Sequence, residues 1–368
     1  MTKKDLASIR RRFSPEKNDI SIIRGCFVNE KREIVSTFSK SPISLPENEA
    51  EHYLVSFKKT LGGAAGRNQF TIPVHTDDPA GQLLRQLQLS SLTDEKAIRR
   101  LFDIIREKME FDGSYLILAM HDAYSVTYRK PEAHTDAPDF SDKVFNYIVV
   151  SVCPVKLTKP LLTFFNEDRD FHTVEPDLAV GSPALGFMYP VFSDAGADVN
   201  AALYYTKDAA DIHADFVDAV FQASAPDSVD DKREAFYGVL GDSLEKGLTF
   251  DVVQTLHENL IAQMSERKKG AELQVGRKEI ASLLDSCDVA AKEQAAFENE
   301  YLEHFGAVGL DAGLIADQKR FELETENAKI SIDPDRSDLV TVKRVDGRRV
   351  IMITVEGEIS VNGIEVDV

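Results

Sequence analysis

The chain of 368 residues contains no tryptophan and only three cysteines. The cysteines are Cys26, Cys153 and Cys287, which are widely spaced, odd in number and free of any CxxC pattern. This spacing excludes a dense disulfide framework and the common cysteine-based zinc sites. Three reduced thiols in a cytosolic protein are the simplest interpretation.

Long hydrophobic runs are also absent. The longest ones, around Tyr115–Met120 and Tyr147–Val150, are much shorter than the roughly 20 residues that a membrane-spanning helix needs. The first residues, MTKKDLASIRRRF, carry charges that no apolar stretch follows, so they do not resemble a secretory signal. We therefore predict a cytoplasmic protein with no membrane partner.

The familiar catalytic and nucleotide-binding motifs are missing. The chain has no GxxxxGK[ST], no HExxH, no GxSxG and no GxGxxG after a strand. The glycine-rich run at 62–67 follows a predicted helix, whereas a phosphate-binding loop precedes one. The crowded loop that holds His134, Asp136 and Asp139 shows no ligand spacing typical of a metal site. We predict no cofactor and no metal, and lean towards a protein that is not an enzyme.

Charge is distributed unevenly along the chain. Residues 1–32 have a net charge of +5, while the remaining residues have a net charge of −24. Within the first segment Arg10, Arg11 and Arg12 are consecutive, and on a helix they point in directions about 100° apart, so they cannot all face a core. Together with Arg24 they predict a basic arm that contacts an anionic partner. The alternative is that these arginines pair with acidic residues of the same protein.

One group of side chains at predicted strand ends allows a catalytic interpretation. His121 and Asp122 end one apolar strand, and Cys153 and Lys156 end another. A neighbouring lysine could lower the pKa of the thiol, and a cysteine–histidine pair could act as nucleophile and base. The structural alternative, which we favour, is that His121 forms a hydrogen bond at a strand end and that Cys153 is a small buried residue.

The pattern of hydrophobic residues predicts an α+β fold. A hairpin is expected from Ile20–Val28 and Glu33–Phe38, and buried strands from the two longest apolar runs. Helices are expected at 46–61, at 80–91 and at 94–110, where Thr93 would be the N-cap. Further strand-like segments lie at 161–165, 186–192 and 200–206.

The predicted organisation is a mixed central sheet with flanking helices in residues 1–208, a helical segment at 209–306 and a C-terminal β-meander at 307–368. In the helical segment Ser228 and Asp288 are predicted helix caps. In the meander Asp346-Gly347, Glu356-Gly357 and Asn362-Gly363 supply the backbone conformations typical of tight hairpin turns. The meander would form its own sheet or complete the main one.

Several sequence blocks resemble an uncharacterised bacterial family, a domain of unknown function of about this length. They run from IRRRFSPEKNDISIIRGCFVNEKREI at the N-terminus, through SYLILAMHDAYSVTY, FNYIVVSVCPVKL, GFMYPVF and ALYYTKD, to VDGRRVIMI and VNGIEV. This resemblance covers the whole chain and implies no activity. The order of elements around the helix ADFVDAVF is similar to that of the bacterial 37-kilodalton nucleoid-associated proteins, which implies a role on nucleic acid.

Taken together, the sequence predicts a non-enzymatic cytosolic binding protein, nucleoid-associated or similar. Its basic arm would contact nucleic acid or an acidic protein. One alternative is an enzyme that uses the strand-end residues. Another is a homo-oligomer whose C-terminal strands pair between chains.

Overall fold

A computed structural model describes all residues except 1–2, 130–139, 168, 194–195, 268–272 and 367–368. The chain divides into two compact units, Met1–Ser228 and Val229–Val368. Each unit is described by itself.

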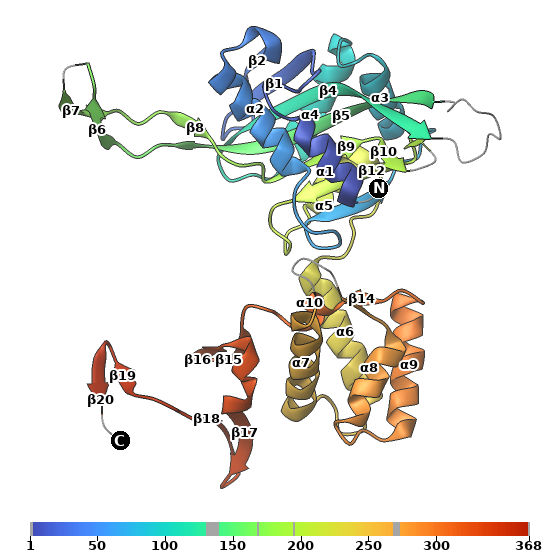
Figure 1. The fold of residues 1–368 in the computed structure, drawn as a ribbon, viewed down its shortest axis with the longest axis vertical. Helices are drawn as coiled ribbons and strands as arrows, with labels where there is room; N and C mark the ends of the chain where they lie inside the picture. The colour runs from blue at the N-terminus through green and yellow to red at the C-terminus, as the bar shows by residue number, and fades with distance from the viewer. Residues whose placement is uncertain (1–2, 130–139, 168, 194–195, 268–272, 367–368) are drawn as a thin grey trace. The chain divides into compact units, whose positions relative to one another are not determined.

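The first unit is built around an eight-stranded sheet (Figure 1). Seven strands follow the order β2-β1-β4-β5-β9-β12-β3, and β8 pairs with β5. The α+β fold is confirmed. All of these strand pairs are antiparallel, whereas we predicted a mixed sheet. The strands are β1 (Ile22–Val28), β2 (Ile34–Lys40), β3 (Gln69–Pro73), β4 (Ser114–Arg129), β5 (Phe140–Leu157), β8 (Leu178–Val180), β9 (Leu185–Tyr189) and β12 (Ala201–Thr206).

The predicted N-terminal hairpin and the two predicted buried strands are confirmed. β1 pairs with β2, and both β4 and β5 extend beyond the apolar segments that identified them. The polar segment between them, with the candidate metal ligands His134, Asp136 and Asp139, lies outside the described residues. β3 was not predicted: its sequence QFTIP alternates polar and apolar residues, but over only five positions that end in proline.

Helices cover both faces of the sheet, as Figure 1 shows. Alternate residues of β4 point to opposite faces, so Ile117 belongs to one core and Leu118 to the other. α3, α4 and α5 contribute to the first core, and α1 and α2 to the second. These helices are α1 (Lys3–Arg12), α2 (Glu47–Thr60), α3 (Pro79–Leu89), α4 (Glu95–Lys108) and α5 (Ala214–Phe221), with a short 3-10 turn at Pro42–Ser44.

Two details of the helices differ from prediction. α4 is capped by Asp94, whose carboxylate accepts hydrogen bonds from the amides of Lys96 and Ala97, rather than by Thr93. α5 was grouped with the helices that follow it, but Phe216 and Phe221 pack against Tyr204 and Phe187 of the sheet. Aromatic packing therefore places α5 in the first unit.

A hairpin arm extends from the end of β5 and β8. It consists of β6 (Leu161–Phe165) and β7 (Asp170–Val174), which pair only with each other among the described strands. In Figure 1 it projects away from the sheet on the left. A second small pair, β10 (Val191–Ser193) with β11 (Gly196–Asp198), lies after β9.

The second unit contains the helical segment. Phe236, Leu256 and Phe297 are among its fully buried side chains, as expected for the core of a small helical bundle. α8 was not predicted, and α9 is preceded by Ala290 as N-cap where we predicted Asp288. The elements are α6 (Val229–Ser243), α7 (Phe250–Ser265), β13 (Gln274–Val275), α8 (Arg277–Asp285), α9 (Ala291–Phe305), β14 (Leu310–Asp311) and α10 (Ala312–Ile315).

The C-terminal strands form three separate hairpins rather than one meander. None of them pairs with the main sheet in the part of the chain that the structure describes. Asp346-Gly347 and Asn362-Gly363 both have positive φ and make the tight turns predicted for them, because this conformation suits the right-handed twist of a hairpin. Glu356-Gly357 instead lies between two hairpins. The strands are β15 (Phe321–Thr325), β16 (Ala328–Ile332), β17 (Val340–Val345), β18 (Arg348–Ile353), β19 (Ile359–Val361) and β20 (Ile364–Val366), with a 3-10 segment at Pro334–Leu339.

Among the described residues, no helix has the length and apolar character needed to cross a bilayer.

Candidate functional site

The four arginines of the predicted basic arm have very different surroundings. Arg11 is exposed, whereas Arg10 is half-buried and its Nε has no hydrogen-bond partner among the described residues. The side chains of Arg12 and Arg24 are only 19% and 12% exposed, and both form ion pairs within the first unit. Arg12 and Arg24 therefore pair with the protein's own acidic residues, which was the alternative to an anionic partner.

Arg12 is held by Asp122, in the middle of β4. Its Nε and Nη2 donate to the two carboxylate oxygens of Asp122 at 3.1 and 3.0 Å, and Nη2 also donates to Asp19 at 2.8 Å. The guanidinium lies over the ring of Tyr124, 5.2 Å from its centroid. Burial lowers the pKa of Arg12, but the hydrogen bond and the charge of Asp122 outweigh it and raise the pKa. A fork of this kind fixes α1 on the sheet.

Asp122 is the buried centre of this network. Its side chain has no solvent exposure, and it accepts a 2.6 Å hydrogen bond from the hydroxyl of Tyr147 on β5. Burial and the carboxylate of Asp122 raise the pKa of Tyr147 well above its ordinary value. These contacts satisfy a buried charge, and neither of the two main surface hollows among the described residues includes it. The network is structural.

The other residues that we predicted at strand ends, His121, Cys153 and Lys156, do not come together. His121 belongs to the face of the sheet that α3, α4 and α5 cover, whereas Cys153 belongs to the opposite core. Cys153 pairs with Leu116, five residues from His121, which separates them by roughly 17 Å along the strand. Burial lowers the pKa of His121, and its Nε2 has no hydrogen-bond partner among the described residues. A cysteine–histidine pair is thus excluded by geometry.

Cys153 also lacks the electrostatics of a nucleophile. Burial raises the pKa of its thiol to about 12, against smaller opposing effects of Ser56 and Lys59, and burial raises the pKa of Cys26 to about 11. Lys156, the predicted activating residue, is exposed one residue past Val155 on the strand. The interpretation in which Lys156 lowers the thiol pKa of Cys153 is therefore wrong, because desolvation outweighs the effects that lower this pKa. The alternative that we favoured, a small buried cysteine, describes Cys153.

This difference predicts the order of thiol reactivity. At pH 8, iodoacetamide should modify the partly exposed Cys287, while Cys26 and Cys153 should react at least about 1,000-fold more slowly in the folded protein. Mass spectrometry of digested samples would measure the three rates, with urea-unfolded protein as the control in which all three react. Faster modification of Cys153 than of Cys287 at pH 7 would restore the enzyme hypothesis.

Among the described residues, no group of three or more histidine, cysteine, aspartate or glutamate side chains is arranged so that it could hold a metal ion.

A groove beside β2 is the remaining candidate for a binding site. It encloses about 400 Å³ between this edge strand and α4. The floor is apolar and comes largely from Ile98 and Phe102 of α4, and Arg24 and Arg99 bring positive charge to it. The lining residues are Arg24, Ile34, Thr37, Phe38, Ser39, Glu95, Ile98, Arg99 and Phe102.

The groove exists because β2 has small side chains where a core strand would have large ones. Thr37 pairs with Cys26 and Ser39 with Arg24, so these two polar residues lie on the face that α4 covers. They are too small to fill the space above Ile98 and Phe102. Phe38, which is large, sits opposite Gly25, where its ring occupies the position a Cβ would take.

Charged residues fix one wall of the groove. Arg24 donates from Nε to the carbonyl of Leu92 at 3.0 Å and pairs with Glu95 at 2.7 Å. Arg99 lies one turn further along α4, and its side chain is 75% exposed, with Asp103 3.9 Å away. Each arginine therefore has an acidic partner, and Arg99 is the more exposed cation at the rim of the groove.

β2 also offers its backbone. It is the terminal strand of the sheet order, and no described strand pairs with its outer edge. Every second residue of such a strand directs its N–H and C=O groups away from the sheet. A free strand edge therefore runs along the groove.

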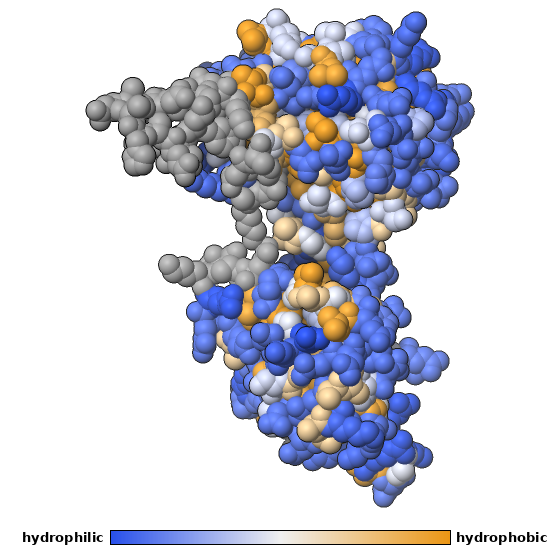
Figure 2. All heavy atoms as spheres, turned by 90° about the vertical axis from the view of Figure 1, so that its right-hand side faces the viewer, coloured by the Kyte–Doolittle hydropathy of each residue, from blue (hydrophilic) through white to orange (hydrophobic). Residues whose placement is uncertain are grey.

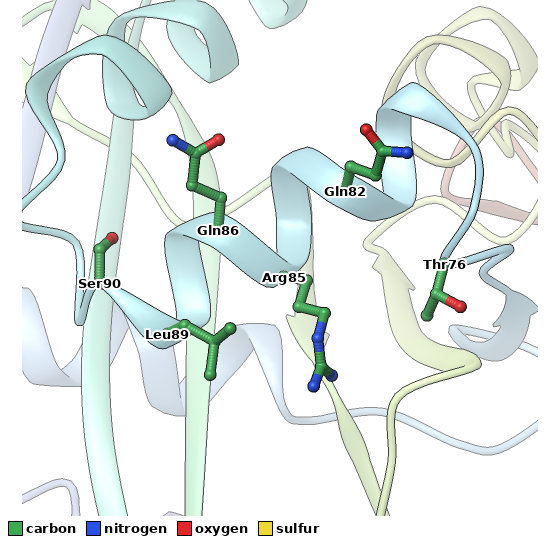
Figure 3. Close-up of a pocket in the computed structure, with 6 residues that line it drawn as sticks. All are labelled: Thr76, Gln82, Arg85, Gln86, Leu89 and Ser90. Carbon is green, nitrogen blue, oxygen red and sulfur yellow. The ribbon is translucent and has the colours of Figure 1, made fainter.

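A second hollow, on the outer face of α3, is a weaker candidate. In Figure 3, Arg85 and Leu89 extend to one side of the helix and Gln82 and Gln86 to the other, so their polar groups do not converge. Thr76 and Ser90 complete the lining. We assign it no function.

Sequence reasoning found Arg24 but not the groove. Ile98 and Phe102 lie in the helix predicted at 94–110, and both belong to the first core. The detectable signal was the small polar residue Thr37 within the predicted strand, with Ser39 just after its predicted end.

Comparison with known proteins identifies a family. A family model described as "Domain of unknown function (DUF4317)" matches residues 1–364. This confirms the predicted resemblance to such a family along nearly the whole chain. No curated protein and no solved structure matches, so the likeness to nucleoid-associated proteins gains no support.

Proposed function

We propose that this chain, which belongs to the DUF4317 family, is a binding protein that takes up an extended peptide along the edge of β2. The observation that carries the proposal is the coincidence of an unpaired strand edge, among the described strands, with a groove lined by both apolar side chains and two arginines. A peptide that adds a strand to a sheet gains affinity from backbone hydrogen bonds and specificity from the pockets that receive alternate side chains.

The groove indicates the composition of the peptide. Side chains on one face of an added strand would lie over Ile98 and Phe102 and should be apolar. A carboxylate at the rim would meet Arg99, whose side chain is 75% exposed and lies 3.9 Å from Asp103. Arg24, in contrast, is mostly buried and pairs with Glu95 at 2.7 Å. We therefore expect alternating apolar and acidic residues. This keeps the anionic partner that the sequence predicts, but makes it an acidic polypeptide.

Nucleic acid is less well supported. Of the arginines proposed to contact phosphate, only Arg11 is exposed, and two are occupied by Asp122 and Glu95. A protein that neutralises several phosphates needs several free cations on one surface.

The test is fluorescence anisotropy with a labelled eight-residue peptide of alternating valine and glutamate. Binding in the micromolar range is expected, and a version with lysine in place of glutamate should bind at least tenfold more weakly. Labelled double-stranded DNA, measured at low and physiological salt, serves as the alternative ligand. Tight, salt-dependent DNA binding without peptide binding would overturn the proposal.

A matched pair of variants locates the site. Arg99→Glu should weaken peptide binding at least tenfold, because it reverses the charge at the rim of the groove. Arg100→Glu makes the same change on the neighbouring exposed residue, which does not line the groove, and should have less than a threefold effect. Equal effects would show general electrostatic attraction instead. Protection of β2 amides from hydrogen exchange on peptide binding would identify strand addition directly.

A further inference from the structure

The hairpin arm formed by β6 and β7 carries an unusual amount of exposed apolar surface. Every residue of both strands is exposed, and Leu162, Phe171 and Leu161 are 69%, 57% and 62% exposed. The apolar surface continues onto the base of the arm, where Leu157 of β5 pairs with Leu178 of β8. Nine apolar side chains take part: Leu157, Leu161, Leu162, Phe164, Phe165, Phe171, Val174, Leu178 and Val180.

Both faces of the arm are apolar. The register pairs Leu161 with Val174 on one face, together with Phe165. On the other face Phe164 pairs with Phe171, their ring centroids 5.2 Å apart, beside Leu162. A hairpin that packs on its own protein needs one apolar face, and its solvent side is normally polar. Apolar residues on both faces indicate a surface that something else covers.

The amount of surface fits a second copy of the chain. Each of the nine side chains is at least 40% exposed, so the arm presents on the order of 800 Å² of apolar surface if side chains of this size bury roughly 150–250 Å² each. A standard stable interface buries about 800 Å² per partner. An isolated two-stranded hairpin is marginally stable in water, and packing against a second hairpin would cover its apolar face.

The side of the first unit that Figure 2 shows favours contact between two arms over contact between an arm and that side. Figure 2 views the side opposite the direction in which the arm projects in Figure 1. On that side the hydrophobic residues of the first unit form small spots among hydrophilic ones. It offers no apolar surface comparable to the arm among the described residues, whereas a two-fold axis brings identical surfaces together.

We propose that two copies of this protein associate through their β6–β7 arms, with Phe164 and Phe171 at the centre of a two-fold interface. The aromatic face of each arm packs on that of its partner. This association is independent of the peptide groove at β2.

Sedimentation velocity between 1 and 100 µM tests the proposal on the full-length protein. The wild type should sediment as a dimer, and the double variant Phe164→Asp/Phe171→Asp as a monomer, with self-association weakened at least 100-fold. Ile43→Asp is the matched control, because Ile43 is 78% exposed outside the arm, and it should remain dimeric. Circular dichroism should show unchanged folding in both variants.

Two results would overturn the proposal. One is a wild type that remains monomeric at 100 µM. The other is a dimer that survives in the double variant, which would place the interface elsewhere, for example in the C-terminal strands. A second readout uses Phe164→Cys combined with Cys287→Ser, which should form a disulfide-linked dimer under mild oxidation. The second change removes the partly exposed native thiol, and Cys26 and Cys153 are fully buried.

Discussion

Replacing Arg12 with alanine should destabilise the first unit by about 3 kcal/mol, since breaking a buried ion pair leaves an uncompensated charge behind. The charge left behind is Asp122, whose side chain has no exposure and would keep only the hydroxyl of Tyr147 and the amide of Ala123 as donors among the described residues. The urea unfolding transition, followed by circular dichroism, would measure the loss.

Three further variants separate the ion pair from other effects. Arg11→Ala removes an exposed arginine one residue away and should change stability by less than about 0.5 kcal/mol. Arg12→Lys should lie in between, because a lysine keeps the charge but not the two-pronged contact with Asp122. Adding Asp122→Asn to Arg12→Ala should recover part of the loss. A stability of Arg12→Ala equal to that of the wild type would contradict the structural role of the network.

This prediction also changes how the basic arm should be tested. A triple variant of Arg10, Arg11 and Arg12 would combine the loss of exposed charge with the destabilisation caused by removing Arg12. Arg11→Ala alone is the informative change for nucleic-acid binding.

Replacing Gly186 with alanine should have a comparable effect, about 3 kcal/mol, because it overpacks a closely packed site. Gly186 lies in β9 under α2, and a Cβ there would overlap the carbonyl oxygen of Val150 and come within 2.7 Å of Cγ2 of Thr60. A backbone oxygen in the middle of a sheet has nowhere to move, so even a single added methyl group is costly. Thermal and urea unfolding of the purified variant would measure the effect.

The control for Gly186→Ala is a second glycine-to-alanine change that should increase stability. Gly238 lies within α6, and no atom of the described residues is within 4 Å of the position that an added methyl group would take. Gly238→Ala should therefore stabilise its unit by about 0.5–1 kcal/mol. Adding Thr60→Ser to Gly186→Ala should recover little, since the contact with Val150 remains. Wild-type stability of Gly186→Ala would mean that α2 and β9 are less closely packed than in the structure.

Local patterns were sufficient where neighbouring residues decide the structure. Turn residues such as Asp346-Gly347 and the apolar stripe of α4 correctly predicted a hairpin turn and a helix, because both depend on backbone conformation and on periodicity over a few residues. The same reasoning missed β3, whose pairing with β12 joins Gln69 to Tyr205 across the sequence. It also grouped α5 with the wrong helices.

The chemistry of the site depended on residues far apart in the chain. Arg12 and Asp122 are 110 positions apart, and only the fold shows that one neutralises the other. His121 and Cys153 were predicted to end their strands, but both lie within longer ones, because β4 continues to Arg129 and β5 to Leu157. The strands are neighbours, yet the two side chains lie on opposite faces and far apart along them.

The sequence by itself therefore determined the α+β class, most of the helices and strands, and the membership of a family, because these follow from local periodicity and from similarity along the whole chain. The tertiary structure alone decided which charges are free. It buried Arg12, paired Arg24 with Glu95 and left Arg99 beside an open strand edge. An ion pair, a buried thiol and a groove all depend on which distant side chains share one volume, and composition contains no record of that.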